Sequence, residues 1–397
     1  MNILIIGNGG REHALAWKIA QSSLAKKIYV APGNAGTELT NLIENIDIQD
    51  IDLLIQFARE RKIDLTIVGP EAPLSQGIVN KFKENNLKIF GPTKEAAQLE
   101  SSKDFSKRFM KKHGIPTAEY QTFTEPKLAH DYIDKKGSPI VIKADGLASG
   151  KGVVVAMTDN DAHNAIDLML SENQFGNAGA RIIIEEYLTG EEASFIVICD
   201  GKTVLPLATS QDHKRLLDND LGPNTGGMGA YSPAPIVTAE IHEKAMNEVI
   251  YPTIEGMKKD GIEYTGFLYA GLMIDKNSQI KTLEFNCRMG DPETQPILFR
   301  LESDLLKILY DAAQGKLEEN MALWENNFSI TVVMAAKDYP NKPRFNDEIL
   351  GLDSKEKDTY IFHAGTKLIG QKVMTSGGRV LGITAKGQTL NEAKNKA

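Results

Sequence analysis

Short apolar runs alternate with longer amphipathic segments along the first hundred residues of the chain. Runs with the length and composition of β-strands occupy residues 2–6, 28–31, 65–68 and 87–90. Segments of helical length separate them, among them residues 12–22 and 50–62. Because strands that alternate with helices form a parallel sheet covered by those helices, we expect an α/β domain at about residues 1–100.

The pattern changes after a predicted helix at residues 94–112, which ends before Gly114 and Pro116. Between residues 139 and 200 the order becomes strand, glycine-rich loop, strand, helix and two further strands. This order predicts a small α+β module that folds over a neighbouring domain as a lid.

A stretch rich in Gly, Asn, Asp and Pro occupies residues 210–235, and we expect a loop there that is too long to be a passive connector. Two strands and a helix follow, at residues 269–275, 280–286 and about 293–313. The tail from residue 328 shows mainly strand patterns, with a helix that begins near Leu390. The predicted fold class is therefore α/β and α+β multidomain, with a small, mainly β domain at the C-terminus.

Composition and charge narrow the class of protein. The 397 residues, 42% hydrophobic and 25% charged, are enough for two to four domains with hydrophobic cores. A net charge of -8 disfavours a nucleic-acid partner, which would need a basic surface. Cys199 and Cys287 lie in separate apolar runs, so we expect neither a disulfide framework nor a CxxC metal site. We see no signal peptide or membrane span and expect a cytoplasmic protein.

The first glycine-rich loop, residues 7–13, lies between a predicted strand and a predicted helix. Backbone N–H groups at a helix N-terminus attract anions, so this loop favours a phosphate-bearing metabolite. The dinucleotide fingerprint would need glycine where this chain has Glu12, and an acidic residue after the second strand, where residues 31–34 read APGN. A nicotinamide or flavin site is therefore disfavoured, and a purely structural tight turn stays open as the alternative.

The second glycine-rich loop, residues 145–152, resembles a P-loop only superficially. Gly146 and Gly150 are one residue too close, Gly152 replaces the Ser or Thr that would contact magnesium, and a strand follows where a helix should begin. A glycine-rich turn between two strands can instead fold over nucleotide phosphates as a flap, with Lys143 and Lys151 as point charges. A flexible hairpin tip is the alternative interpretation.

Acidic residues also lie at the end of the second predicted strand after this flap, near residue 186. The run Glu185–Leu188 turns at Gly190 into Glu191 and Glu192, where a hinge that holds adenine would lie. The indication is weak, because acidic residues at a strand end are usually only solvated.

The clearest candidate for a metal site is the strand TLEFNCR at residues 282–288. Side chains alternate along a strand, so Glu284 and Asn286 share one face, and Leu283, Phe285 and Cys287 share the other. Two hard oxygen ligands suit Mg²⁺, which also binds phosphate oxygens and water. Arg288 extends the same face, where a cation could stabilise a transferring phosphoryl group. A polar edge strand is the alternative.

The stretch at 210–235 carries a basic tripeptide, His213 to Arg215, and a glycine-rich segment at residues 226–229. The basic residues could hold a carboxylate or phosphate, and the glycines expose backbone donors. We assign His213 a binding role only, and a disordered surface loop remains the alternative.

Seven segments, in this order and spacing, resemble the phosphoribosylamine–glycine ligase family of the ATP-grasp superfamily, over about residues 1–385. They are NILIIGNGGREHALAWK, PGNAGT, VGPEAPLSQGIV, GPTKEAAQLESSKDFSKRFM, KADGLASGKGVVVA, SQDHKRLLDNDLGPNTGGMGAYSP and EFNCRMGDPETQ. The resemblance implies a pre-ATP-grasp domain at 1–100, an ATP-grasp domain at 101–327 with a lid at about 115–190, and a C-terminal domain at 328–397. Family members continue past such a final helix with a strand, so we expect this last domain to be truncated here.

The family's reaction joins glycine to 5-phosphoribosylamine with ATP, through glycyl phosphate, in the second step of purine biosynthesis. The implied cofactors are ATP and Mg²⁺ or Mn²⁺, the implied partners are these small molecules, and the implied state is a monomer or weak dimer. Implied catalytic residues are Arg288 and Lys143, and implied metal ligands are Glu284 and Asn286. Implied ATP contacts are Lys103, Lys143, Gly146, Ser149, Gly150, Lys151, Gly152, Glu185, Glu186, Leu188 and Glu192. Implied substrate contacts are Gly9, Gly10, Arg11, Glu12, Pro32, Gly33, Asn34, Gly36, Asp212, His213, Lys214, Gly226, Gly227, Met228, Asp291 and Glu293.

Two other functions stay open. Another ATP-grasp ligase, such as a purine-pathway carboxylase, would share the flap but not the SQDHKRLLDNDLGPNTGGMGAYSP segment. A nucleotide-binding regulatory module without turnover would keep the flap and hinge, but it would not need Glu284, Asn286 and Arg288 together.

Overall fold

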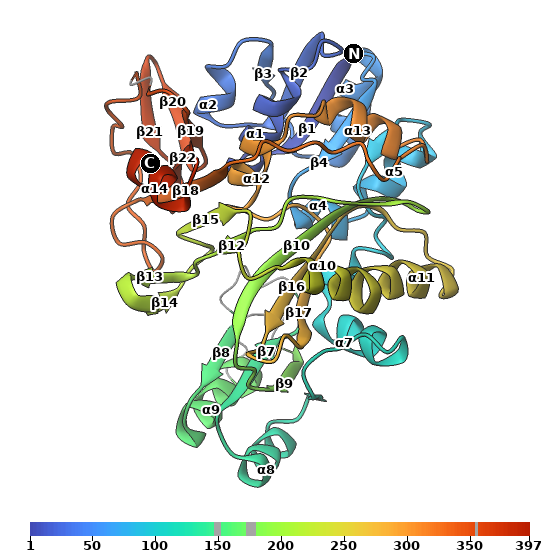
Figure 1. The fold of residues 1–397 in the computed structure, drawn as a ribbon, viewed down its shortest axis with the longest axis vertical. Helices are drawn as coiled ribbons and strands as arrows, with labels where there is room; N and C mark the ends of the chain where they lie inside the picture. The colour runs from blue at the N-terminus through green and yellow to red at the C-terminus, as the bar shows by residue number, and fades with distance from the viewer. Residues whose placement is uncertain (147–151, 172–179, 354–355) are drawn as a thin grey trace.

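The computed structural model describes residues 1–146, 152–171, 180–353 and 356–397. Figure 1 shows the N-terminal and C-terminal sheets at one end of the molecule, a central sheet in the middle and the lid at the other end. Among the described residues, no helix combines the length and the apolar character needed to cross a lipid bilayer.

The N-terminal domain is built on a parallel sheet with the order β3-β2-β1-β4-β5, which confirms the predicted α/β arrangement. Its strands are β1 (Asn2–Gly7), β2 (Lys27–Pro32), β3 (Ile43–Asn45), β4 (Leu65–Val68) and β5 (Ile89–Phe90). The sequence analysis did not predict β3, which is only three residues long. Helices α1 (Gly10–Ile19), α2 (Ala35–Glu38), α3 (Ile51–Glu60), α4 (Glu71–Ser75) and α5 (Ile78–Glu84) connect them. Gly7 and Pro32 pair in register, so the loops after β1 and β2 meet at one edge of the sheet.

The helix predicted at residues 94–112 is two helices, α6 (Gln98–Ser101) and α7 (Lys103–Lys112). The break falls at Ser102, whose backbone is extended and whose hydroxyl accepts a hydrogen bond from the N–H of Phe105. An N-cap of this kind satisfies a helix-end donor, and it starts α7 in a new direction. Lys103 therefore stands at the first turn of α7.

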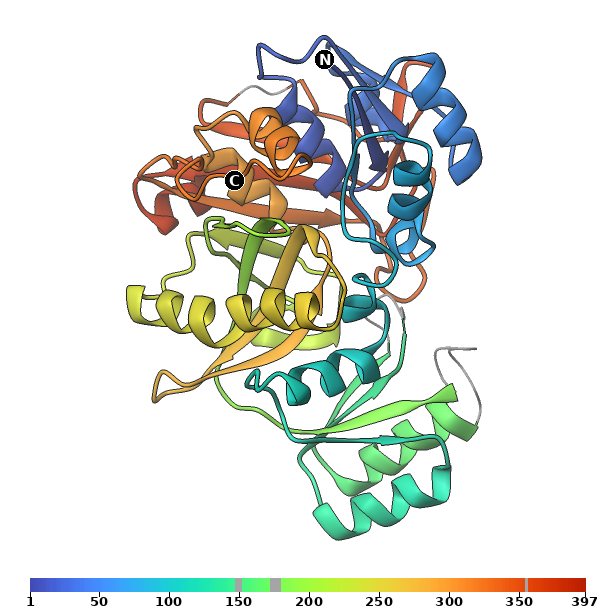
Figure 2. The same cartoon turned by 90° about the vertical axis from the view of Figure 1, so that its right-hand side faces the viewer.

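The lid, residues 120–171 and 180–186, has its own sheet with the order β6-β9-β7-β8, antiparallel in each pair. Its strands are β6 (Tyr120–Phe123), β7 (Ile140–Ala144), β8 (Val153–Ala156) and β9 (Ile182–Glu186). Helices α8 (Pro126–Lys136) and α9 (Asp159–Ile166), continued by η1 (Asp167–Ser171), pack on this sheet. Figures 1 and 2 show both helices at the far end of the lid.

The central sheet has the order β11-β10-β16-β17 and is antiparallel. Its strands are β10 (Glu191–Asp200), β11 (Val204–Pro206), β16 (Thr265–Ile274) and β17 (Ile280–Asn286). Helices α10 (Ala239–Lys244), η4 (Ala245–Ile250) and α11 (Tyr251–Lys259) run across one face of this sheet (Figure 2). The helix predicted at 293–313 is two helices, α12 (Thr294–Arg300) and α13 (Leu305–Ala312). Both pack in one hydrophobic core with strands of the N-terminal sheet.

The segment predicted as a loop at 210–235 contains strands, so that prediction was wrong in part. It forms β12 (Gln211–Asp212), β13 (Arg215–Leu217), η3 (Asp218–Asp220), β14 (Leu221–Asn224) and β15 (Gly229–Ser232). Later strands are β18 (Phe328–Ala335), β19 (Thr359–His363), β20 (Thr366–Ile369), β21 (Lys372–Thr375) and β22 (Arg379–Gly387), followed by α14 (Leu390–Lys396). The sheet order β12-β15-β18-β22-β19 ties this segment to the C-terminal strands.

Candidate active site

The carboxylate of Glu284 lies at the centre of a group of basic side chains. Burial acts to raise the pKa of this carboxyl, but nearby cations outweigh burial and hold the pKa below its ordinary value. These cations are Lys214, Lys143, Lys103 and Arg288. Each of these cations contacts another group. Lys214 contacts Glu192, and Lys143 contacts Glu185. Lys103 donates to the Gly146 carbonyl, and Arg288 contacts Glu100. Glu284 is therefore held as an anion whose oxygens are available to a ligand.

A β-bulge at Leu283 changes the alternation that the sequence predicts along β17. The pairing passes from Gly271 opposite Glu284 to Leu272 opposite Thr282, which leaves Leu283 as an extra residue. Leu283 is only half-buried, and its carbonyl accepts a hydrogen bond of 3.4 Å from Nζ of Lys143. Placing Leu283 in the apolar face was therefore wrong, because the bulge turns it out of the ladder.

Phe285 and Cys287 are buried in the core as predicted, and Asn286 is 8% exposed. Glu284 and Asn286 together offer hard oxygen atoms of the type that Mg²⁺ prefers. Among the described residues, no group of three or more His, Cys, Asp and Glu side chains could hold a metal ion by itself. The donor set thus fits a hard cation that takes its other ligands from phosphate and water.

Three lysines lie near Glu185: Lys143 on β7, and Lys103 and Lys107 on α7. Glu185 accepts from Lys143 at 3.0 Å and from Lys107 at 2.9 Å, both on Oε2. Burial lowers the pKa of Lys107 to about 8, although Glu185 acts to raise it. Burial also lowers the pKa of Lys103, whose Nζ donates to the Gly146 carbonyl at 2.9 Å. The lysines form one electrostatically coupled group.

The acidic residues at the end of β9 already form hydrogen bonds within the protein. The N–H of Glu186 donates to the Glu119 carbonyl, and its carboxylate accepts from Lys281 and from the N–H of Glu119. Glu186 therefore uses its N–H and its Oε1 atom in contacts within the protein. Within the part of the chain that the structure describes, the N–H of Leu188 has no hydrogen-bond partner.

Arg288 follows the end of β17 rather than extending it. Its guanidinium contacts Glu100 at 2.9 Å and Glu71 at 3.5 Å, carboxylates contributed by α6 and α4. Burial acts to lower the pKa of Arg288, but these two acids raise it by more. Two carboxylates on separate helices thus orient the guanidinium while it stays close enough to lower the pKa of Glu284.

Asp212 and Lys214 bring the 210–235 segment into the same group. Nζ of Lys214 lies 2.6 Å from Glu192. Burial raises the pKa of Asp212 to about 7, although Lys214 acts to lower it. His213, which lies between them, is exposed, because alternation along the chain turns it the other way. The structure therefore turns His213 away from Asp212 and Lys214, with which the family resemblance groups it as a substrate contact.

Glu293 is 3% exposed, and two hydroxyl groups of the central sheet donate to its carboxylate. Its Oε1 accepts from the Tyr269 hydroxyl at 2.8 Å and from the Ser194 hydroxyl at 3.1 Å. A Cβ on Gly290 would lie 2.5 Å from the Glu293 carboxylate, so glycine is required there for this carboxylate to fit.

The first glycine-rich loop encloses a buried ion pair between Arg11 and Glu12. The N–H of Gly9 donates to Glu12, and the N–H of Arg11 donates to Asp291 at 3.1 Å. A Cβ on Gly69 would lie 2.1 Å from Glu12, so the glycine makes room for this carboxylate. The N–H groups of Gly9 and Arg11 were expected to face a phosphate. In the structure they donate hydrogen bonds to carboxylates instead.

The loop after β2, at the same edge of the N-terminal sheet, is organised by Asn34, which is 5% exposed. The side-chain oxygen Oδ1 of Asn34 accepts from the N–H groups of Gly36 and Thr37, and its side-chain nitrogen Nδ2 donates to the His363 carbonyl at 2.9 Å. A Cβ on Gly33 or on Gly36 would collide with a neighbouring side chain. The segment Pro32–Gly36 is therefore a fixed turn against the C-terminal sheet.

Arg379, at the start of β22, joins the C-terminal sheet to the loop after β14. Its Nη1 donates to the carbonyls of Gly226 and Asp291, each at 2.6 Å, and lies 3.4 Å from the Gly227 carbonyl. Burial acts to raise the pKa of Asp291, but Arg379 and Arg11 lower it by more. Arg379 thus holds both the loop and the ionised carboxylate.

Several predicted residues have other outcomes. Ser149, Gly150 and Lys151 lie outside the described residues. Gly10 lies at the start of α1, and Gly152 directly precedes β8 and accepts the N–H of Ala144 on its carbonyl. Met228 is half-buried and donates its N–H to the His213 carbonyl.

The sequence analysis did not find Lys107, Glu100, Tyr269, Ser194 or Arg379. Lys107 follows Lys103 by one helical turn, which is a signal that it shares a face with a predicted phosphate contact. The other four come from elements distant in sequence, and no local pattern marks them.

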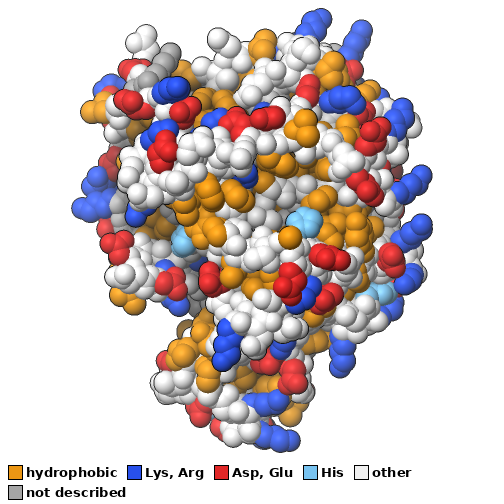
Figure 3. Space-filling model, viewed as in Figure 1, with side chains coloured by type: hydrophobic (Ala, Val, Ile, Leu, Met, Phe, Trp, Pro, Cys, Tyr) orange, Lys and Arg blue, Asp and Glu red, His pale blue; other side chains and the backbone are white. Residues whose placement is uncertain are grey.

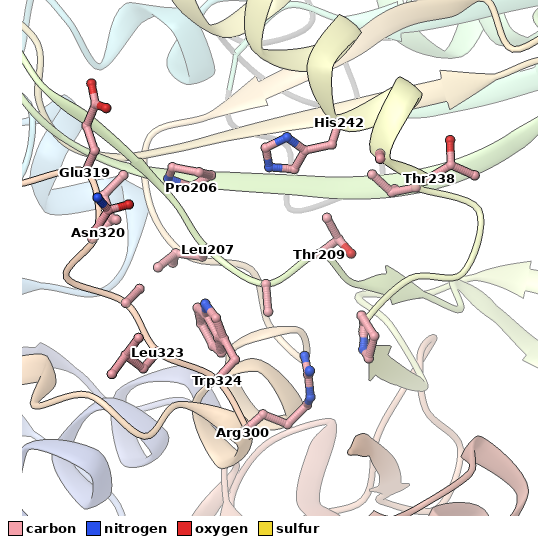
Figure 4. Close-up of a pocket in the computed structure, with 16 residues that line it drawn as sticks. Pro206, Leu207, Thr209, Thr238, His242, Arg300, Glu319, Asn320, Leu323 and Trp324 are labelled. Atoms are coloured by element: carbon pink, nitrogen blue, oxygen red, sulfur yellow. The ribbon is translucent and has the colours of Figure 1, made fainter. Parts of the chain in front are cut away.

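A pocket of about 560 Å³ beside β11 and α10 contains none of the predicted site residues. Its lining includes Thr209, His242 and Trp324, which Figure 4 shows around the opening. Arg300 at its edge already donates to Ser232 and to two backbone carbonyls. Figure 3 shows apolar side chains gathered across the middle of this face between charged groups.

Three family descriptions match successive parts of the chain. They are the N domain of phosphoribosylglycinamide synthetase at residues 1–100, its ATP-grasp (A) domain at 101–294 and its C domain at 329–397. Among curated proteins, the phosphoribosylamine–glycine ligase of Ralstonia nicotianae is 58% identical, covering 100% of this chain and 94% of that protein. The enzyme of the same name from Haemophilus influenzae is 60% identical over 100% of this chain and 93% of its own length.

Solved structures agree with these matches. The phosphoribosylamine–glycine ligase of Thermotoga maritima superposes with a TM-score of 0.85 at 34% identity, covering 100% of this chain and 95% of that one. Biotin carboxylase from Campylobacter jejuni superposes with a TM-score of 0.77 at 17% identity over 100% and 89% of the two chains, which is a likeness of fold alone. The chain belongs to the phosphoribosylamine–glycine ligase family of ATP-grasp enzymes.

Proposed function

We propose that this chain joins glycine to 5-phosphoribosylamine at the expense of ATP, giving glycinamide ribonucleotide, ADP and phosphate. The names of its full-length relatives support this activity. The observation that carries the proposal is the ionised Glu284 among four cations, since such a site can hold a metal and neutralise a phosphoryl group. Two buried cysteines, neither in a disulfide, support a cytoplasmic setting.

ATP would lie between the lid and the central sheet. Lys103 and Lys143 would contact its phosphates under the flap Gly146–Gly152, as preorganised cations do in phosphoryl transfer. The Glu186 carbonyl and the Leu188 N–H would pair with adenine, an acceptor and donor two residues apart. Glu192 would bind the ribose hydroxyls after its contact with Lys214 opens. Among the described residues Oε1 of Glu185 is buried without a partner, which supports an adenine amino group nearby.

Mg²⁺ or Mn²⁺ would be held by Glu284 and Asn286. When bound, the metal would neutralise phosphate charge during transfer. The protein's own part is to keep Glu284 ionised and to keep Arg288 oriented through Glu100 and Glu71, so that its guanidinium faces the transferring group.

The chemistry requires activation of glycine, because a carboxylate is a poor acyl donor. A carboxylate oxygen of glycine attacks the γ-phosphorus of ATP, and the bond to ADP breaks, giving glycyl phosphate. The amine of phosphoribosylamine then attacks the acyl carbon, the carbon–oxygen bond to phosphate breaks, and the amine releases a proton. Lys143 and Arg288 would stabilise the phosphoryl charge, and no protein nucleophile is needed.

The acceptor substrates would lie against the turns at the N-terminal sheet edge and the glycine-rich segment beside β15. Residues Gly9–Glu12 and Pro32–Gly36 would contact phosphoribosylamine. Asp212, Lys214, Gly226–Met228, Asp291 and Glu293 would line the rest of this side. We place the domain limits at 1–100, 101–327 and 328–397.

The test is ADP release with ATP, Mg²⁺ and glycine, with and without freshly generated phosphoribosylamine, and with bicarbonate replacing glycine. ADP formed only when glycine and the amine are both present would support the ligase. Turnover with bicarbonate would move the chain to the carboxylases, and no turnover with either would refute both.

A further inference from the structure

Strand β19 of the C-terminal sheet lies beside α1 and α2 of the N-terminal domain (Figure 1). Among the described residues, β19 is the last strand of its sheet, with β22 on its other side. Ala364, directly after β19, donates its N–H to Val380 of β22. Because successive residues of a strand direct their backbone groups to opposite sides, the N–H and the carbonyl of His363 point away from β22. Backbone groups that face outward in this way need partners outside the sheet.

Two side chains of the N-terminal domain are those partners. Nδ1 of His13, on α1, accepts the N–H of His363 at 2.9 Å. Nδ2 of Asn34, in the turn after β2, donates to the His363 carbonyl at 2.9 Å and to the Asn8 carbonyl at 2.9 Å. One backbone unit of β19 therefore fixes both the helix that follows the first glycine-rich loop and the turn after β2. Asn34 also links the two loops directly.

The imidazole of His13 contributes an acceptor that packing alone would not require. Since Nδ1 accepts, the hydrogen of the neutral ring is on Nε2, and among the described residues Nε2 is buried without a hydrogen-bond partner. An unpaired buried donor costs stability that an apolar side chain would not cost. Burial, with a smaller contribution from the ring of His363, lowers the pKa of His13 to about 3. Nδ1 therefore stays unprotonated at neutral pH and can accept.

Glycine at position 36 lets the turn after β2 approach this contact closely. A Cβ on Gly36 would lie 2.3 Å from Cε1 of His13 and 2.6 Å from Cγ of His363, so a residue with a side chain would collide with both rings. The N–H groups of Gly36 and Thr37 donate in turn to Asn34. A change at His13 should therefore alter the whole turn.

We propose that His13 is a positioning residue for the acceptor substrate, and that it holds the two loops in place through the backbone of His363. This inference rests on the proposed function, in which Gly9–Glu12 and Pro32–Gly36 contact phosphoribosylamine. His13 itself would not touch the substrate, because it is 1% exposed and its ring packs against Phe362. The C-terminal domain would thus support substrate binding through a main-chain contact.

The experiment compares His13→Asn with His13→Leu. Asparagine and leucine have nearly the same shape and leave the same space beside Gly36, but only asparagine retains an acceptor, because its Oδ1 takes the place of Nδ1. Loops that bind the substrate equally in the ground and transition states affect KM and leave kcat unchanged. We expect His13→Leu to raise the KM for phosphoribosylamine about 5- to 100-fold, with kcat and the KM for ATP within about twofold of wild type. His13→Asn should recover most of this loss.

Hydrogen exchange tests the same contact without any substrate. The amides of His363, Gly36 and Thr37 should exchange at least about tenfold faster in His13→Leu than in His13→Asn. Ser22→Ala is the matched control, because the Ser22 hydroxyl donates to Asp304 at 2.7 Å just beyond the other end of α1. This control should lower the resistance to chemical unfolding and leave the KM for phosphoribosylamine unchanged.

Three results would overturn the proposal. One is an unchanged KM for phosphoribosylamine in folded His13→Leu, and another is an equal rise in both variants, since the acceptor would then not be the cause. The third needs no variant: in the wild type, an amide of His363 that exchanges as fast as a solvated amide would show that the contact is absent. Absence of wild-type turnover would instead refute the proposed function, and hydrogen exchange would still show whether His13 holds the turn.

Discussion

Replacing Arg379 with Met should impair the acceptor side of the site without touching the nucleotide side. The substitution removes the Nη1 donor that holds the carbonyls of Gly226 and Asp291, and it removes one of the two arginines that lower the pKa of Asp291. The glycine-rich segment beside β15 should then move away from Asp291. The chain length and the apolar stem of the side chain are retained.

The size of the effect follows from the bonds that are lost. A hydrogen bond from a charged donor contributes about 1.5–3 kcal/mol, and Arg379 makes two short ones, but its side chain is 24% exposed, so solvent recovers part of the loss. A net loss of about 2–3 kcal/mol, if fully expressed in the transition state, lowers kcat/KM about 30- to 160-fold. We expect the KM for phosphoribosylamine to rise more than the KM for ATP.

The assay is ADP release as a function of pH and of each substrate. Since Arg379 and Arg11 together hold the pKa of Asp291 low, losing Arg379 should shift the acidic limb of kcat/KM to higher pH. Arg344→Met is the control, because Arg344 pairs with Asp347 at 2.8 Å on an exposed surface of the same domain. An unchanged KM for the amine together with an unchanged acidic limb would refute the positioning role of Arg379.

Three further substitutions test the site. Glu284→Gln should lower Mg²⁺-dependent turnover by at least about 100-fold with the fold intact by circular dichroism, and an unchanged rate would exclude Glu284 from the metal site. Arg288→Lys should lower turnover because a point charge cannot contact Glu100 and Glu71 as the guanidinium does, and full activity would exclude its phosphoryl role. Burial raises the pKa of Asp212 to about 7, so its stabilising contribution is present in acid and is lost as pH rises from about 4 to about 7. Chemical unfolding of the wild type should therefore show stability falling across that window relative to Asp212→Asn, and parallel curves would contradict this.

The sequence predicted the local features of the molecule well. Apolar runs that alternate with helical segments gave the parallel N-terminal sheet, because strands buried on both faces need apolar residues throughout. The polar positions of β17 indicated Glu284 and Asn286, whose oxygens remain available in the structure. The second glycine-rich loop differed from a P-loop by its spacing and by the strand after it, and β8 does follow it.

Some predicted features failed where a single residue changed the local geometry. Ser102 divides the helix expected at 94–112, because its hydroxyl caps a second helix. The bulge at Leu283 interrupts the two-residue alternation, which sequence periodicity alone cannot detect.

What the sequence determined by itself was the order of elements and the chemical types at the site: glycine turns, lysines, and a strand with two oxygen ligands. Tertiary structure decided the partners. Pairing of β15 with β18 and of β18 with β22 brings Arg379 to Gly226. Packing of α7 beside β9 brings Lys107 to Glu185, and pairing of β7 with β9 brings Lys143 to the same carboxylate oxygen. The physical reason is that ionisation and hydrogen bonding depend on neighbours within a few ångströms in space, and here most of those neighbours are many residues away along the chain.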